Sequence, residues 1–133
     1  MNSRQFAQVF GAIYLIVGIL GFIPYTAPAN SSLGPGGAQL LGLFPVNYVH
    51  DVVHLVLGIW GLASAGTMVR AVMFCRVFAV LLLALGIYGL IDWGGTMPTE
   101  SLVPLGGYDS LLHLASGLLA AYFGWGAPSK AVA

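Results

Sequence analysis

Three histidines and one aspartate stand in two pairs with the same spacing. His50 and His54 are four residues apart. Asp109 and His113 have the same separation. On a helix, residues four apart lie on one face, one turn from each other. Imidazoles and a carboxylate suit a borderline divalent ion, zinc first and then copper, iron or manganese. The spacing predicts a metal site whose four ligands are His50, His54, Asp109 and His113.

Asp51 is a fifth candidate for the same cluster. At about 100° per residue, Asp51 falls at the edge of the helix face that carries His50 and His54. It is expected to be a further ligand, an acceptor that orients an imidazole, or a proton acceptor. A metal that activates a bound water would allow hydrolysis, with Asp51 taking the proton. The sequence has no catalytic serine motif, and it leaves open whether the protein is an enzyme.

Other functions fit the same residues. Asp109 facing His50, and His54 facing His113, can form hydrogen bonds that only set the register of a helix bundle. The protein is then a non-catalytic accessory or interaction protein, whose glycine-rich helix faces pack against its own copies or other membrane proteins. His54 and His113 are each followed four residues later by glycine, so they can also be the two axial ligands of a haem in electron transfer. A proton or ion relay is a further alternative.

The composition sets the environment in which these residues lie. The chain has 133 residues, of which 59% are hydrophobic and 6% charged, whereas a soluble domain carries about 25% charged residues. Four basic and four acidic residues cancel, which excludes nucleic acid as a partner. The single cysteine, Cys75, excludes a disulfide scaffold or a zinc finger. The lipid bilayer is the expected partner.

Four apolar segments are long enough to cross a bilayer, which needs about 20 residues per helix. Proline and glycine bound each segment, for example Pro24 and Pro45. We therefore predict an all-α fold, a polytopic four-helix transmembrane bundle that forms a single domain over residues 1–133. The expected spans are about 6–23, about 46–65, about 72–93, and from Pro104 or Gly107 to about 125.

The few charges predict the orientation. With four spans, all basic residues fall on one side of the membrane and all acidic residues lie toward the other. Because Lys and Arg mark the cytoplasmic face, we expect a multi-pass protein of the cell membrane with both termini cytoplasmic. The first apolar segment is expected to remain a span and not to be cleaved. The His/Asp cluster then lies near the outer face. The basic residues are Arg4, Arg70, Arg76 and Lys130, and the acidic ones are Asp51, Asp92, Glu100 and Asp109.

The two halves of the chain align with each other. A shift of 68 residues places the first span on the third, and a shift of 59 places the second on the fourth. We predict two parallel two-helix repeats, about 6–66 and about 72–126, related by an axis along the membrane normal. The aligned pairs are Phe10 and Phe78, Gly18 and Gly86, Gly21 and Gly89, His50 and Asp109, His54 and His113, and Gly58 and Gly117.

The polar pairs belong to two longer patterns, Asn-x-x-His-x-x-x-His from Asn47 to His54 and Asp-x-x-Leu-His from Asp109 to His113. In these patterns the chain resembles a family of small four-span bacterial membrane proteins of unknown function. Asp51 departs from the family, which more often has Asn there. The resemblance implies a fold and no activity. Further matching residues are Phe6, Ala7, Gly11, Tyr14, Leu15, Gly18, Gly21, Phe22, Phe44, Pro45, Val46 and Gly58.

Overall fold

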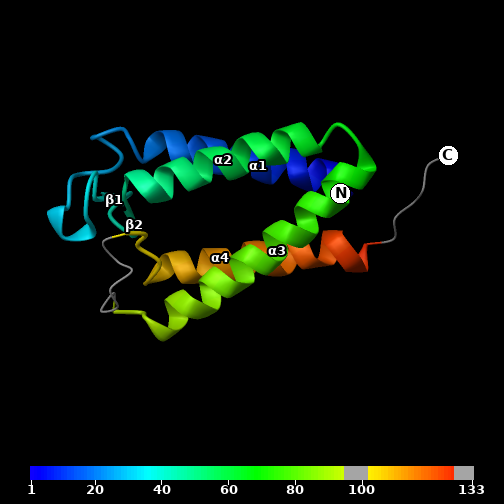
Figure 1. The fold of residues 1–133 in the computed structure, drawn as a ribbon. Helices are drawn as coiled ribbons and strands as arrows, with labels where there is room; N and C mark the ends of the chain where they lie inside the picture. The colour runs from blue at the N-terminus through cyan, green and yellow to red at the C-terminus, as the bar shows by residue number, and fades with distance from the viewer. Residues whose placement is uncertain (95–101, 128–133) are drawn as a thin grey trace.

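Two helical hairpins make up this computed structural model, which describes residues 1–94 and 102–127. Helix α1 (Ser3–Leu20) packs along α2 (Tyr48–Ser64), and α3 (Met68–Ile91) packs along α4 (Tyr108–Ala121). The end of α4 passes into a π-helical turn, η3 (Tyr122–Gly126). Figure 1 shows the two hairpins stacked on each other, with α2 and α4 running in the same direction. The chain is mostly helical, as predicted.

Among the described residues, two of the four α-helices satisfy the length and composition of a membrane span. These are α1 and α3, with mean hydropathies of 1.4 and 2.3. Helix α2 is apolar but has 17 residues, and α4 has 14 before the π-helical turn. The structure thus gives two candidate membrane helices where the sequence predicted four.

Polar side chains fix where three of the helices begin. The Asn2 and Gln5 side chains form a capping box at the start of α1, and Thr67 caps α3. Asn47 caps α2, because its Oδ1 accepts a hydrogen bond of 2.9 Å from the backbone N–H of His50. Such caps satisfy amide groups that have no partner within the helix. The cap at Asn47 places His50 in the first turn of α2.

A small sheet corrects the all-α prediction. Strands β1 (Ala38–Leu40) and β2 (Phe44–Val46) pair antiparallel, after a short 3-10 helix, η1 (Ser31–Leu33). Leu41 and Gly42 between the strands have φ of 54° and 71°, as in the tight turns that suit hairpins. Leucine rarely adopts positive φ, so no residue pattern at this position predicts a hairpin. The hairpin packs against the end of α1 next to the first turn of α2.

The opposite end of the bundle holds an aromatic core. The rings of Phe6 and Phe123 have centroids 5.2 Å apart, and those of Phe74 and Phe78 are 4.8 Å apart. The Ser3 hydroxyl donates a hydrogen bond of 2.8 Å to the Phe123 carbonyl. The beginning of α1 and the end of η3 therefore lie at the same end of the bundle (Figure 1).

Equivalent glycines make equivalent contacts in the two hairpins. A Cβ atom on Gly18 would lie 2.9 Å from the backbone N of Leu55, and one on Gly86 would lie 3.0 Å from that of Leu114. These positions correspond under the shifts of 68 and 59 residues in the sequence. Small residues allow helix backbones to approach this closely. In the same way, a Cβ atom on Gly58 would lie against Leu15 and one on Gly117 against Leu83, and these positions correspond under the same shifts.

Arginine side chains lie at the end where α2 and η3 finish. Arg4 Nε donates to the Ala65 carbonyl at 2.8 Å, and Arg76 Nε donates to the Gly124 carbonyl at the same distance. A cation at a helix C-terminus complements the helix dipole and the free carbonyl groups there. Two of the charges used to predict orientation, Glu100 and Lys130, lie outside the described residues.

Candidate metal centre

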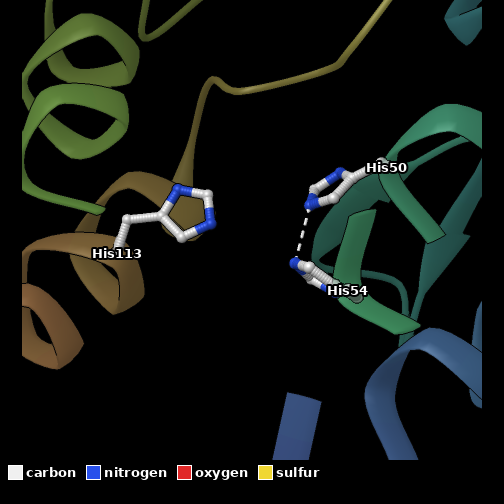
Figure 2. Close-up of side chains that lie close together, drawn as sticks. All are labelled: His50, His54 and His113. Atoms are coloured by element: carbon white, nitrogen blue, oxygen red, sulfur yellow. Dashed lines mark hydrogen bonds between the residues drawn. The ribbon is translucent and has the colours of Figure 1, made fainter. Parts of the chain in front are cut away.

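The first two turns of α2 and the second turn of α4 bring the three histidines together. One ring nitrogen from each of His50, His54 and His113 lies within 4.8 Å of the other two. The Nε2 atoms of His50 and His54 are 3.0 Å apart. Figure 2 shows His113 reaching from α4 toward the two rings of α2, so that all three rings share one space. The i, i+4 spacing thus places His50 and His54 on one face, as predicted.

Asp109 lies beside the histidines. Its Oδ2 is 3.6 Å from His50 Nε2 and 3.5 Å from His113 Nε2. The relative exposure of these side chains is at most 7%, and His54 is 7% exposed as a residue. The four residues predicted as ligands therefore meet in one buried cluster built from two helices.

Several polar atoms of the cluster have no hydrogen-bond partner in the part of the chain that the structure describes. They are the Nδ1 atoms of the three histidines and Oδ2 of Asp109. A buried polar atom without a partner costs free energy, and such atoms are rare in native proteins. Carboxylate Oδ2 is also an electron-pair donor turned toward two imidazoles. A cation among these groups would engage Oδ2 and the Nε2 atoms together.

Asp51 occupies a different place. It is fully buried, yet neither carboxylate oxygen has a hydrogen-bond partner among the described residues. Its carboxylate fills the space next to Gly21 that a Cβ atom on this glycine would need. Asp51 therefore faces the end of α1, and it is not in the group that the three histidines form.

Two residues near the cluster had no predicted role in the site. Tyr14 of α1 contacts His54 edge to face, with ring centroids 5.0 Å apart. It lines one cavity together with Ser116 and three of the cluster residues. Asn47 positions the cluster, because its side-chain amide also donates to the carbonyls of Leu33 and Leu102. In the sequence, Tyr14 is a tyrosine in an apolar run and Asn47 lies three residues before His50, and both are among the residues that match the family pattern.

The geometry disfavours the haem alternative. A porphyrin bound to Nε2 of His54 would have to lie next to that atom. His50 Nε2 already lies 3.0 Å from it. This separation leaves no room for the plane of a porphyrin between the two imidazoles.

These features define a mostly helical protein with a buried three-histidine cluster and two helices apolar enough to cross a membrane. A family model described as domain of unknown function (DUF4383) matches residues 4–126, and the chain belongs to this family. No curated protein and no solved structure matches the chain. The family has no assigned activity, so the site itself must carry any proposal about function.

Proposed function

We propose that this protein is a multi-pass membrane protein whose His/Asp cluster binds a divalent transition metal ion near the outer face of the membrane. The observation that carries the proposal is the buried group of His50, His54 and His113, with ligand atoms within 4.8 Å of one another. If these side chains only set the register of the helices, three histidines from two helices would not need to meet in one place. A single pair would do that.

Three of the distances between donor atoms are close to those around an ion of this kind, and the other histidine nitrogens, within 4.8 Å of one another, would move closer on binding it. Zinc binds imidazole nitrogen at about 2.0–2.1 Å with tetrahedral geometry, so its ligand atoms are about 3.3 Å apart. The contacts of Nε2 with Nε2 and of Nε2 with Oδ2 in the cluster are 3.0, 3.5 and 3.6 Å. Imidazole and carboxylate donors favour zinc, and they are acceptable for copper, iron or manganese.

The outer surface of the bundle supports four membrane spans. Large apolar side chains are exposed on all four helices, and a soluble monomer rarely exposes so much contiguous apolar surface. Helix α4 and η3 together run from Tyr108 to Gly126, which is about the length that a span needs. Examples of exposed side chains are Ile16 on α1, Val56 and Ile59 on α2, Val80 and Ile87 on α3, and Leu118 and Leu119 on α4.

The matched contacts of the two hairpins support an internal repeat. Gly18 with Leu55 corresponds to Gly86 with Leu114 under the same two shifts that align the sequences. The arginine contacts with Ala65 and Gly124 lie at the end opposite the cluster. Because basic residues mark the cytoplasmic side, both termini are cytoplasmic in this proposal and the cluster faces outward.

A bound metal would supply Lewis-acid chemistry at this place, polarising a ligand or making a bound water easier to deprotonate. Asp109 is the carboxylate placed to bind the ion or to orient its imidazole ligands there. Its Oδ2 lies within 3.6 Å of two of the imidazole nitrogens and has no hydrogen-bond partner of its own among the described residues. Asp51, which the sequence suggested for this role, faces Gly21 instead.

Metal analysis of the purified protein tests the proposal. We expect close to one transition metal ion per chain in the wild type and a strong loss in His54→Ala and His113→Ala. Ser110→Ala is the matched control, since Ser110 is equally buried in the first turn of α4 but bonds to the Leu105 carbonyl. A folded wild-type protein that takes up no metal after incubation with zinc would leave only the structural hydrogen-bond network.

A further inference from the structure

A cavity of about 190 Å³ lies directly beside the histidine cluster. His54, Asp109 and His113 line it, together with the hydroxyl-bearing side chains of Tyr14 and Ser116. All its other lining side chains are apolar and come from α1, the β1–β2 hairpin and α4. The polar groups of this cavity are thus the groups of the candidate metal centre and its two hydroxyl neighbours.

The cavity is large enough for part of an organic molecule and reaches the outer surface of the bundle. An apolar cavity of about 150 Å³ is known to hold benzene. Two of the lining side chains on the helices are also exposed, Ile13 at 44% and Leu112 at 50%. In a bundle that spans the membrane, side chains on this surface face lipid. The cavity therefore opens sideways, toward hydrocarbon.

A second apolar hollow extends the lining of the cavity along α4. It is lined by Leu43, Phe44, Tyr108, Leu111 and Leu112, and it shares Phe44 and Leu112 with the cavity beside the histidines. The apolar lining thus continues from the cluster toward the first residue of α4. A hydrocarbon chain longer than the cavity can continue along this surface.

The charge of the cluster indicates what kind of group would complete it. A divalent ion carries two positive charges, three neutral imidazoles add none, and the Asp109 carboxylate adds one negative charge. The buried centre then has a net charge of +1, and an uncompensated charge is costly away from water. One monoanionic ligand brings the sum to zero. The three histidines and Asp109 fill four coordination positions, and a fifth ligand can be added because zinc sites can expand to five-coordinate geometry.

We propose that the cluster binds a long-chain carboxylate that enters from the bilayer. Its head group binds the metal, and its hydrocarbon chain lies in the cavity and leaves it past Ile13 and Leu112. This inference rests on the proposed metal centre. It adds the class of ligand, a single-chain amphiphile with one negative charge. The Tyr14 and Ser116 hydroxyls lie on the same cavity lining and offer hydrogen bonds to the carboxylate.

Cobalt(II)-loaded protein in lipid nanodiscs tests this ligand class, because the visible absorption of cobalt responds to a new ligand. We expect laurate to change the spectrum in a saturable way, at concentrations at least about tenfold below those that acetate needs. Leu112→Trp, which fills the mouth of the cavity, should weaken the laurate response at least about tenfold, and more than it weakens the response to acetate, which has no hydrocarbon chain to place there. Leu118→Trp, an exposed position on α4 that does not line the cavity, should behave as wild type.

The outcomes separate this inference from the proposed function. A folded protein that takes up no cobalt overturns the metal centre and the lipid ligand together. A cobalt-loaded protein with equal responses to laurate and acetate keeps the metal centre and overturns the lipid ligand alone. The same conclusion follows if laurate binds Leu112→Trp as well as it binds the wild type.

Discussion

Asp109 is the residue whose charge matters most in the cluster. Its Oδ2 lies within ion-pair distance of His50 and His113, and Asp109 as a whole is only 5% exposed. With a metal present, the carboxylate offsets part of the charge of the ion and orients or supplements its ligands. Without a metal, it faces two imidazoles that carry no charge unless they are protonated.

The substitution Asp109→Asn should weaken metal binding about 10–100-fold, because it removes the negative charge and keeps the size of the side chain. The metal-free protein should retain its helical content. Competition with a chromophoric chelator measures the affinity, and circular dichroism measures the helix. Ser110→Ala serves as the control for a change in the first turn of α4. Unchanged affinity in Asp109→Asn would show that this carboxylate takes no part in metal binding.

Spacing was sufficient to predict that His50 and His54 share one helix face and that Asp109 and His113 share another, because residues four apart lie on the same face. It could not show which neighbour each face would meet. Asp51 is adjacent to His50 in sequence, but the turn of about 100° between them directs it to Gly21 on α1. Tyr14 comes from a helix far away in sequence, and only the packing of α1 against α2 brings it to His54.

Among the helices, the contact of α1 with α2 depends on glycine at position 58. A Cβ atom there would lie 2.5 Å from the backbone N of Leu15 and 2.8 Å from the Gly11 carbonyl oxygen. Both neighbours are backbone atoms, so the two helices would have to move apart.

The predicted ends of the helices agree with the structure to within a few residues. The β1–β2 hairpin was missed because Leu41 takes a positive φ that its sequence does not signal.

Gly58→Ala should destabilise the protein by about 1–3 kcal/mol, as overpacking of a close helix contact usually does. Gly117→Ala should act in the same direction, because the added Cβ atom would lie 2.9–3.0 Å from Leu83. Gly66→Ala is the matched control, since its Cβ atom would meet only the Ala63 carbonyl oxygen, at 3.7 Å. Thermal melts in detergent measure the effect. Equal melting temperatures for Gly58→Ala and Gly66→Ala would contradict the close packing of α1 on α2.

For the whole molecule, the positions of the arginines predict the topology. We expect Ser32→Cys, between α1 and α2, to react with a membrane-impermeant maleimide on intact cells. Val69→Cys, in the first turn of α3, should react only after lysis. Both positions are exposed, and the native Cys75 is buried, so the labelling reports the side of the membrane. The opposite pattern would place the histidine cluster on the cytoplasmic side.

The central claim is that histidine nitrogens in this bundle hold a metal ion. Its most direct test is the melting temperature of zinc-loaded protein, with and without chelator, at about pH 7.5 and about pH 5.5. An imidazole binds metal only through an unprotonated nitrogen, so protons compete with the ion. An ion at 100 times its Kd stabilises the folded state by about 2.7 kcal/mol.

We therefore expect chelator to lower the melting temperature by several degrees at the higher pH. At the lower pH, below the ordinary histidine value of about 6.5, the zinc-loaded protein should lose stability and the effect of chelator should shrink. In Asp109→Asn the effect of chelator should already be smaller at the higher pH. Melting curves that are identical with and without chelator at both pH values would contradict the metal centre.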